Sequence, residues 1–345
     1  MATTKAGVRK IPEGQKSGCH LTAGVTTRDI SLRLSITPVC PFKCAYCQPE
    51  GLAGTPSLPV LPARTISRLV WMLSRIGVNR VRLTGGEPLS RPDCAGIISQ
   101  IRVNREIRDI ALTTNGEWLA RQAHRLRQAG LDRINIHLDT LRPDRFLKIT
   151  GRDRLDAVIA GIDTAVQAGL SPVKVNTVLM AGINDDELVD FCNFSVSRNI
   201  TVRFIELMNT GPAPEFVHSR FVSADHARRI IAREFDLIPC VGEDASGPAR
   251  EFRIANGAGR IGFIASETEP FCDRCNRIRL TADGRLRGCL YEPDGVDILS
   301  LLQEWEQDEA AAEGKLRQII AGKRSFHPEC GEQGTQAFPM SGIGG

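Results

Sequence analysis

The sequence lacks any long hydrophobic run. No stretch of the 345 residues is apolar enough to span a bilayer, and the segment Met1 to Lys10 lacks the apolar core of a signal peptide. A strong net charge is also absent, because 44 Lys and Arg residues are balanced by 40 Asp and Glu residues, which gives a formal charge of +4. So small and evenly spread a charge gives no argument for binding a nucleic-acid backbone. We therefore expect a cytoplasmic protein that binds neither membranes nor nucleic acid.

The composition and the number of cysteines indicate the class of protein. The 42% of hydrophobic and 24% of charged residues are typical of a globular protein and exclude disorder or a fibrous fold. The eleven cysteines are an odd number, which in a reducing compartment indicates metal binding or catalysis rather than a disulfide framework. The spacing of these cysteines is therefore the most informative feature of the chain.

Six units of a β-rich run, a turn and a helical pattern follow one another from about residue 26. Between the first two runs, Ile66, Leu69 and Leu73 recur at i, i+3 and i+7, as in a helix that covers a sheet. Six such units predict an α/β fold whose parallel sheet curves into a full or partial barrel of the TIM type, with a doubly wound sheet as the alternative. The predicted strands are Ile30 to Ile36, Arg80 to Thr84, Ile110 to Thr113, Ile134 to Leu138, Val173 to Val178 and Val202 to Glu206.

The pattern divides the chain into three regions. We expect a flexible N-terminal arm at residues 1–25, the barrel at residues 26–235, and a C-terminal region at residues 236–345 that packs on the barrel mouth. In such barrels the chemistry lies at the C-terminal ends of the strands, so the residues that follow each strand are the candidates for the site. The predicted elements of the C-terminal region are two short strands, Glu251 to Ile254 and Arg260 to Ile264, and a helical stretch from Ile298 to Leu316.

The loop after the first predicted strand carries a CxxxCxxC pattern, formed by Cys40, Cys44 and Cys47. Three thiolates at this spacing can bind three irons of a 4Fe-4S cluster and leave the fourth iron open to an external ligand. A zinc site completed by a distant histidine is the alternative. The aromatic Tyr46 before the third cysteine, and the Gly-Gly-Glu-Pro segment at residues 85–88, favour the cluster. This combination resembles the radical S-adenosylmethionine (SAM) superfamily.

A second group of three cysteines lies near the C-terminus and consists of Cys272, Cys275 and Cys289. A CxxC pair with a distal third cysteine is also common in zinc ribbons, and Cys330 or His327 could supply a fourth ligand. The spacing alone therefore leaves a zinc site and a second iron–sulfur cluster open.

The two cysteine groups and the motifs between them together resemble one radical SAM family, the molybdenum-cofactor GTP 3',8-cyclases. The resemblance runs from about Arg28 to the C-terminus and rests on the order and spacing of the motifs. It implies a partial (β/α)6 barrel in which two 4Fe-4S clusters face each other, with SAM on the first cluster and the guanine of GTP on the second. The motifs lie at residues 33–37, 82–88, 112–116, 149–152, 173–176, 203–208 and 344–345.

The resemblance also implies a reaction and its partners. SAM would be cleaved to methionine and a 5'-deoxyadenosyl radical, which abstracts the 3' hydrogen of the GTP ribose so that the carbon radical attacks C8 of guanine. The product would be (8S)-3',8-cyclo-7,8-dihydroguanosine 5'-triphosphate, formed by a lyase in the first step of molybdenum cofactor biosynthesis. An external one-electron reductant, a downstream cyclic pyranopterin monophosphate synthase and a homodimer are the implied partners.

Basic residues make up most of the GTP site that the resemblance implies. Arg33, Arg82 and Lys174 lie in strand runs with apolar neighbours, so the period of two places them on the opposite face from those neighbours. A charge inside a barrel needs an anionic partner, and guanidinium groups bind phosphate oxygens with two hydrogen bonds. We therefore expect a triphosphate site there. The complete implied set is Arg33, Arg82, Thr113, Lys174, Arg277, Ile278 and Arg279.

For SAM, the matching positions are Tyr46, Gly86 and Met208, and for the radical step they are Gly344 and Gly345 of the C-terminal tail. The chain departs from the family pattern at a further SAM position, where His137 stands in place of a serine. Pro41 and Gln48 also replace the residues that usually follow the first and third cysteines.

These departures leave open a paralogue that acts on another nucleotide. A peptide-modifying radical SAM enzyme and a zinc-stabilised nucleotide-binding module are two further hypotheses. The cysteines that match no ligand of the family are Cys19, Cys94, Cys192, Cys240 and Cys330.

Overall fold

The computed structural model describes residues 29–48, 60–208, 214–240, 247–292 and 294–323. The expected N-terminal arm, Cys19, His327, Cys330 and the Gly344–Gly345 tail lie outside the described residues.

Parallel strands form the centre of the structure and follow one another in the sheet in their order along the chain. In β1, the residues Ile30, Leu32 and Leu34 are fully buried and alternate with Ser31 and Arg33, as the period of a strand requires. All six predicted strands are confirmed. Their bounds are β1 Ile30–Ser35, β2 Val78–Thr84, β3 Asp109–Thr114, β4 Arg133–His137, β5 Val173–Leu179 and β6 Thr201–Glu206.

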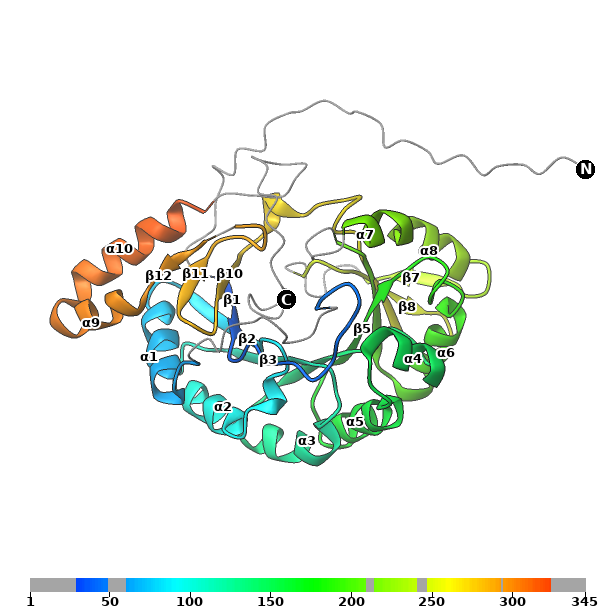
Figure 1. Cartoon of the computed structure of the whole chain (residues 1–345), viewed down its shortest axis with the longest axis horizontal. Coiled ribbons are helices and arrows are strands. Elements are labelled where there is room, and N and C mark those ends of the chain that lie inside the picture. Colours follow the sequence, from blue (N-terminus) through cyan, green and yellow to red (C-terminus); the bar gives the residue numbers. More distant parts are fainter. Residues whose placement is uncertain (1–28, 49–59, 209–213, 241–246, 293, 324–345) are drawn as a thin grey trace, which may run out of the picture.

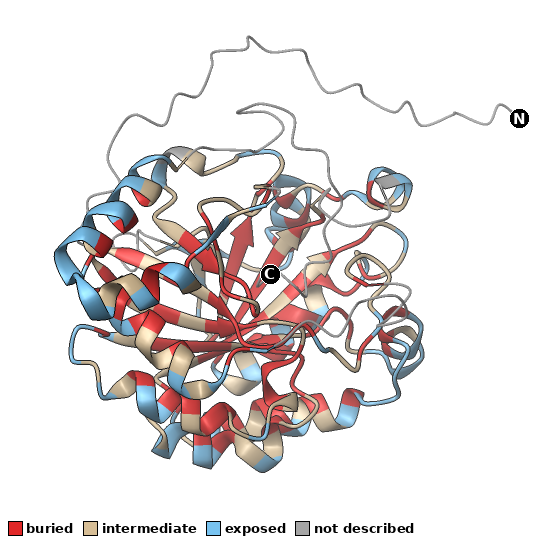
Figure 2. Cartoon of the chain, turned by 60° about the vertical axis from the view of Figure 1, so that its left-hand side comes forward, coloured by how far each residue is buried: buried red, intermediate tan, exposed pale blue. Residues whose placement is uncertain are grey.

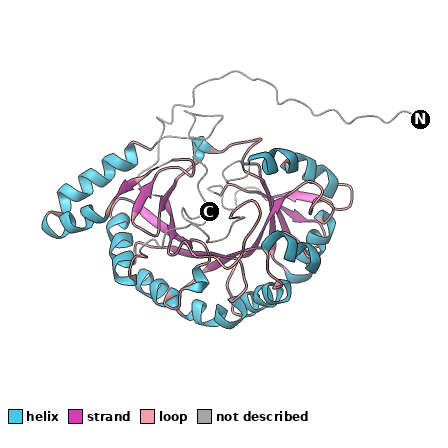
Figure 3. Cartoon of the chain, viewed as in Figure 1, coloured by secondary structure: helices cyan, strands magenta, loops and turns pink. Residues whose placement is uncertain are grey.

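Helices surround the convex side of this curved sheet (Figures 1 and 3). In α1, Ile66, Leu69 and Leu73 are buried against the sheet, as the spacing predicted. Figure 2 shows the buried residues gathered between the helices and the strands. No helix among the described residues is long and apolar enough to cross a membrane. The helices that follow the first six strands are α1 Ala63–Ser74, α2 Cys94–Arg102, α3 Leu119–Gln128, α4 Pro143–Thr150, α5 Leu155–Gln167, α6 Leu188–Arg198, α7 Pro214–Arg220 and α8 Ala224–Ile231, with the short η1 Pro88–Ser90 before α2.

The C-terminal strands lengthen the same sheet at both ends. Strand β9 (Arg260–Ile264) pairs in parallel with β6, and β10 (Arg277–Leu280) pairs in parallel with β1. Each then continues outward through antiparallel neighbours, so the sheet stays open and forms a partial barrel. The outer strands are β8 Arg250–Ile254 and β7 Leu237–Pro239 on one side, and β11 Arg285–Arg287 and β12 Val296–Asp297 on the other.

These pairings join the C-terminal region to both edges of the six-stranded sheet. A six-stranded parallel sheet exposes unpaired N–H and C=O groups on β1 and β6, and β10 and β9 satisfy these groups. The predicted helical stretch is two helices, α9 (Leu299–Gln307) and α10 (Glu309–Ala321). Asp308 separates them because it is extended and its side chain accepts a hydrogen bond of 3.0 Å from the N–H of Ala311.

Candidate active site

One cavity of about 360 Å³ lies at the C-terminal ends of the parallel strands. Its wall includes all six cysteines that the sequence predicted as metal ligands. One loop near the start of the described chain and two segments near its end therefore place three thiols each at the same cavity. The six are Cys40, Cys44, Cys47, Cys272, Cys275 and Cys289.

The first cysteine loop is held against the loop that follows β2. The N–H of Gly86 donates to the carbonyl of Thr37 at 2.7 Å, and the N–H of Glu87 donates to the carbonyl of Val39 at 2.7 Å. A Cβ atom on Gly86 would lie 2.3 Å from the Val39 oxygen. Gly85 has a φ of +141° and an equally close neighbour in Thr37. Both glycines are therefore required for this approach.

Glu87 ties the ends of β2 and β3 together. Its buried carboxylate accepts hydrogen bonds from the Thr114 hydroxyl at 2.7 Å, the Asn115 N–H at 2.6 Å and the Leu89 N–H at 2.9 Å. Burial raises the pKa of Glu87 to about 7, although these three donors act in the opposite direction. The carboxylate acts here as a structural acceptor beside Cys40.

Tyr46, His137 and Asp139 form a hydrogen-bonded group next to the first cysteine loop. The Tyr46 hydroxyl donates to Asp139 Oδ2 at 2.7 Å and contacts His137 Nε2, which lies 2.9 Å from the same carboxylate oxygen. The second oxygen of Asp139 accepts the N–H of Val178 at 2.8 Å. Burial lowers the pKa of His137, but the Asp139 carboxylate outweighs it, so the net effect raises that pKa.

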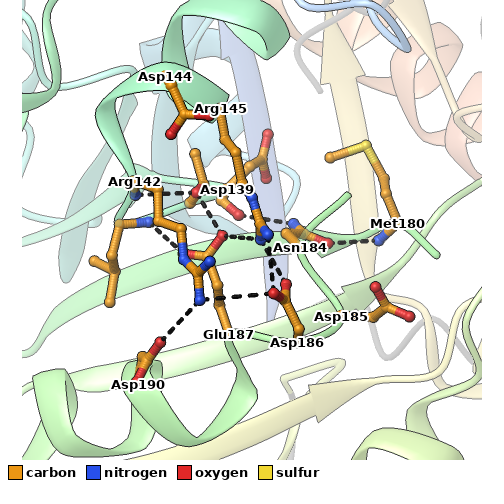
Figure 4. Close-up of polar contacts among 12 residues, drawn as sticks. Asp139, Arg142, Asp144, Arg145, Met180, Asn184, Asp185, Asp186, Glu187 and Asp190 are labelled. Carbon is orange, nitrogen blue, oxygen red and sulfur yellow. Dashed lines mark hydrogen bonds and ion pairs between the residues drawn. The ribbon is translucent and has the colours of Figure 1, made fainter. Parts of the chain in front are cut away.

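A second polar network holds the backbone around Asp139 in place (Figure 4). Asn184 donates to the Asp139 carbonyl at 2.7 Å. Glu187 is fully buried and accepts from the Thr140 hydroxyl at 2.6 Å and from Arg145 at 2.9 Å. The position of Tyr46 is thus fixed by the end of β4 and by the loop between β5 and α6.

The second cysteine loop is anchored to β6 by Glu206, another buried carboxylate. It accepts from the N–H groups of Glu267 and Thr268, both at 2.9 Å, and from the N–H of Ala224 at 2.9 Å. The short helix η2 (Cys272–Arg274) follows this anchored segment. Glu206 therefore sets where the chain leaves β9 on its way to Cys272.

Arginine side chains form a row across three neighbouring strands. Arg279, Arg33 and Arg82 are in register on β10, β1 and β2, and all three line the cavity. Burial and the neighbouring guanidinium groups, Arg82 first among them, hold the pKa of Arg33 well below its usual range. Burial lowers the pKa of Arg82 to about 9 and that of Arg279 to about 10, each with a contribution from a nearby arginine. So many buried like charges indicate an anionic ligand.

A smaller cavity of about 60 Å³ continues below this row toward the N-terminal ends of the strands. Arg33, Arg82 and Arg203 line both cavities. Lys174 lines only the smaller cavity and forms an ion pair with Glu251 at 2.7 Å.

Two unpartnered atoms lie at this end of the site. Among the described residues, neither Arg33 Nε nor Thr113 Oγ1 has a hydrogen-bond partner, although both atoms are buried. Both residues line the larger cavity. Such atoms are rare unless a ligand or water satisfies them, so they indicate where polar groups of a ligand lie.

The structure brings most of the predicted binding residues together. Tyr46, Gly86, His137 and Met208 line the larger cavity, as do Arg33, Arg82, Thr113, Arg277 and Arg279. Ile278 differs, because its side chain is buried in the core on the other face of β10. A contact from Ile278 to a ligand in the cavity would therefore use its backbone.

Sequence reasoning missed three residues of the site. Arg203 follows an apolar residue in a predicted strand, just as Arg33 does, so the same period-two argument could have found it. Asp139 lies two residues beyond His137 and carries no spacing signal of its own. Lys323 lines the cavity from the end of α10, where no motif marks it.

The donor set fits two 4Fe-4S clusters. The six thiols belong to two groups of three on the wall of one cavity. Among the residues that the structure describes, no three His, Cys, Asp or Glu side chains converge closely enough to hold a single metal ion. A 4Fe-4S cluster needs no such convergence, because each thiolate binds a different iron. The two groups of three thiols on one cavity wall therefore fit a cluster on each group.

Two family models match the chain. The Radical SAM superfamily matches residues 34–195, and Molybdenum Cofactor Synthesis C matches residues 200–328. The chain is 39% identical over 315 residues to a GTP 3',8-cyclase of Alkaliphilus metalliredigens, covering 91% of this chain and 97% of the relative. It is 40% identical over 321 residues to a GTP 3',8-cyclase of Heliobacterium modesticaldum, covering 92% and 98%.

Solved structures support the fold. Streptococcus suis SuiB bound to S-adenosylmethionine superposes with a TM-score of 0.60 at 15% sequence identity, over 86% of this chain and 72% of that chain. At this identity the similarity is one of fold alone.

Proposed function

The chain belongs to the GTP 3',8-cyclase family of the radical SAM superfamily, and on this premise we propose that the larger cavity is the site where GTP is cyclised. SAM and a 4Fe-4S cluster occupy the end near Cys40, Cys44 and Cys47. GTP lies between the second cysteine group and the arginine row.

One observation supports this orientation of GTP above all others. Arg279, Arg33 and Arg82 form a continuous row of positive charge, and Arg203 extends it toward the smaller cavity. A nucleoside triphosphate carries several negative charges, and guanidinium groups bind its oxygens in pairs. The unpartnered Arg33 Nε is a donor for these oxygens, and the unpartnered Thr113 hydroxyl is a further polar group at the same end.

Part of the cavity wall is apolar. Val178, Ile205, Leu207 and Ile264 line the cavity and would reduce the contact of bound substrate with water. When bound, the clusters and SAM supply the radical chemistry of this superfamily. The protein's own side chains bind the triphosphate at one end of the cavity. They thereby hold the substrate ribose at a fixed distance from the place where SAM binds.

At the SAM end, the contacts we propose come from Tyr46, Gly86, His137 and Met208. Gly86 presents backbone rather than a side chain to the cavity, since a side chain would collide with Val39. The hydroxyl of Tyr46 and Nε2 of His137 contact each other and Asp139, so a contact from His137 to SAM would use its other ring nitrogen, Nδ1.

The reaction class and the partners of the enzyme are also part of the proposal. Ring closure that adds no group to GTP places the enzyme among the lyases. We propose an external one-electron reductant and a downstream cyclic pyranopterin monophosphate synthase as partners. The homodimer, the cytoplasmic location, the three-region division and the roles of Gly344 and Gly345 stay predictions from the sequence.

The test is an anaerobic assay with the full chain. The protein is reconstituted with iron and sulfide and is given SAM, a reductant and each of the four nucleoside triphosphates in turn. We expect 5'-deoxyadenosine to form only with GTP, together with a product of unchanged mass identified by mass spectrometry. SAM cleavage that is independent of GTP would contradict the proposal and would favour a paralogue with another substrate.

A further inference from the structure

The end of α10 reaches from the outer surface into the cavity. Lys323 lies two residues beyond the last residue of this helix and is half-buried in the cavity wall. Further back in the same helix, Leu316 and Ile320 are buried, and Arg317 donates to the carbonyl of Arg75 at 3.1 Å. The helix is thus fixed to the barrel, and Lys323 projects from a fixed base.

The ammonium group of Lys323 is hydrogen-bonded entirely to the second cysteine loop. Its Nζ donates to the carbonyl of Cys275, to the carbonyl of Arg277 at 2.9 Å and to the Sγ atom of Cys275 at 3.5 Å. A lysine ammonium has three N–H donors, so these three acceptors use all of them.

The stem of the same side chain packs against the other arm of the second cysteine group. A Cβ atom on Gly288 would lie 3.0 Å from Lys323 Cγ and 3.3 Å from its Cβ. Gly288 directly precedes Cys289. Lys323 therefore contacts both segments that carry the cysteines of this group.

Groups of opposite charge lie beside the two cysteine groups. Asn115 connects Cys40 to a carboxylate, because its N–H donates to Glu87 at 2.6 Å and its side-chain amide lies 4.0 Å from Cys40 Sγ. Beside the second group the neighbour is an ammonium group, since Lys323 Nζ lies 3.5 Å from Cys275 Sγ. The second group is thus the one in which a cation donates a hydrogen bond directly to a thiol.

We propose that Lys323 is a positioning residue of the second 4Fe-4S cluster, which fixes the Cys275–Arg277 segment and raises the reduction potential of that cluster by donating a hydrogen bond to Cys275 Sγ. Hydrogen bonds to cluster sulfurs and nearby charge are known to set such potentials. A reduced cluster carries one more negative charge than the oxidised one, so a cation and an N–H donor stabilise it. This inference rests on the proposed second cluster and does not depend on GTP.

Lys323 also holds the backbone of a residue that lines the cavity. It donates to the Arg277 carbonyl, and the guanidinium of Arg277 lies over the Phe271 ring, with the charge centre 4.8 Å from the ring centroid.

The test is a redox titration of the full-length holoenzyme followed by electron paramagnetic resonance, without GTP. Addition of SAM identifies the signal of the first cluster. In Lys323→Met we expect the ratio of reduced to oxidised second cluster to fall about tenfold at a fixed potential, which is about 59 mV for a one-electron couple. The first cluster should keep its potential. Lys315→Met is the matched control, since Lys315 lies on the same helix and pairs with Glu304 on the surface at 2.6 Å.

Full iron content with an unchanged second potential in Lys323→Met would overturn the proposal. If Lys323→Met instead loses the iron of the second group alone, the positioning role is supported and Lys323→Gln tests the potential, because glutamine keeps N–H donors without the charge. A potential in Lys323→Gln close to the wild-type value would then support the hydrogen bond as the cause, and a potential lower by the full shift of about 59 mV would refute it. Failure of GTP cyclisation leaves these potentials measurable, so the two proposals fail separately.

Discussion

At the scale of single residues, Gly86 places the tightest steric constraint on the first cysteine loop. Its backbone occupies space next to the Val39 carbonyl that no side chain can share. The loop after β2 can therefore approach the cysteine loop only with glycine at this position.

Gly86→Ala is expected to lower the free energy of unfolding by about 2–4 kcal/mol, because a Cβ would lie 2.3 Å from a carbonyl oxygen that cannot move far. Gly96→Ala in α2 is the control. A Cβ there meets no atom within 4 Å, and alanine should stabilise the helix by about 0.5–1 kcal/mol. Chemical denaturation of both variants measures the difference, and equal stabilities would show that the close approach does not exist.

His137 makes stability depend on pH. Asp139 raises the pKa of His137 in the folded protein, so the stabilisation is fully present below the ordinary value of about 6.5 and is lost as the pH rises through the raised value. We expect the difference in unfolding free energy between wild type and His137→Asn to be larger at about pH 5.5 than at about pH 9. Urea denaturation at both values checks this. In the Asp139→Asn background the difference should no longer change with pH.

At the scale of elements, the arginine row depends on pairing between β10, β1 and β2. Register places Arg279, Arg33 and Arg82 side by side, which concentrates like charges on neighbouring strands. The adjacent arginines therefore favour the binding of an anion but destabilise the sheet when no ligand is bound.

Arg33→Gln is expected to raise the unfolding free energy of the ligand-free protein by about 1 kcal/mol, because it removes a buried charge beside like charges. The same change should weaken GTP binding at least about tenfold, or about 1.4 kcal/mol, because it removes a phosphate donor. Denaturation without nucleotide and calorimetric titration with GTP measure the two effects. A variant that loses stability while keeping its GTP affinity would argue against the phosphate site.

The six central strands could be predicted from the sequence because each is a short run of alternating or consecutive apolar residues between turns. Cys40 and Cys272 with their partners were found for a similar local reason, since the ligands of one cluster lie close together in the chain. The pairing of β9 with β6 and of β10 with β1 could not be predicted. This pairing joins segments that are distant in the chain, and a local sequence pattern does not indicate which edge of the sheet a strand pairs with. The place of Lys323 in the site could not be predicted for the same reason, because a single lysine after a helix forms no local pattern.

At the scale of the whole molecule, β9 and β10 make the C-terminal region part of one sheet. Its strands share hydrogen bonds with β6 and β1, and Ile261, Ile278 and Leu280 belong to the same hydrophobic core as Leu32 and Leu34. The barrel strands and the C-terminal strands thus share one sheet and one hydrophobic core.

The protein should therefore unfold in one cooperative transition rather than two. We expect a single calorimetric peak for the iron-free chain, with a calorimetric enthalpy equal to the van't Hoff enthalpy. Two resolved peaks, or a stable proteolytic fragment that ends near residue 235, would indicate that the barrel and the C-terminal region fold independently.

The open side of the sheet has a further consequence. Between β9 and β10 the chain passes from one end of the curved sheet to the other through residues 265–276 (Figure 1), and this crossing carries Cys272 and Cys275. Cys289 lies two residues beyond β11, which pairs with β10. Iron bound by these three thiols would therefore tie the crossing segment to the β10–β11 pair. Loss of the second cluster would release the crossing from the end of the sheet, whereas the first cluster lies within one loop and does not depend on this connection.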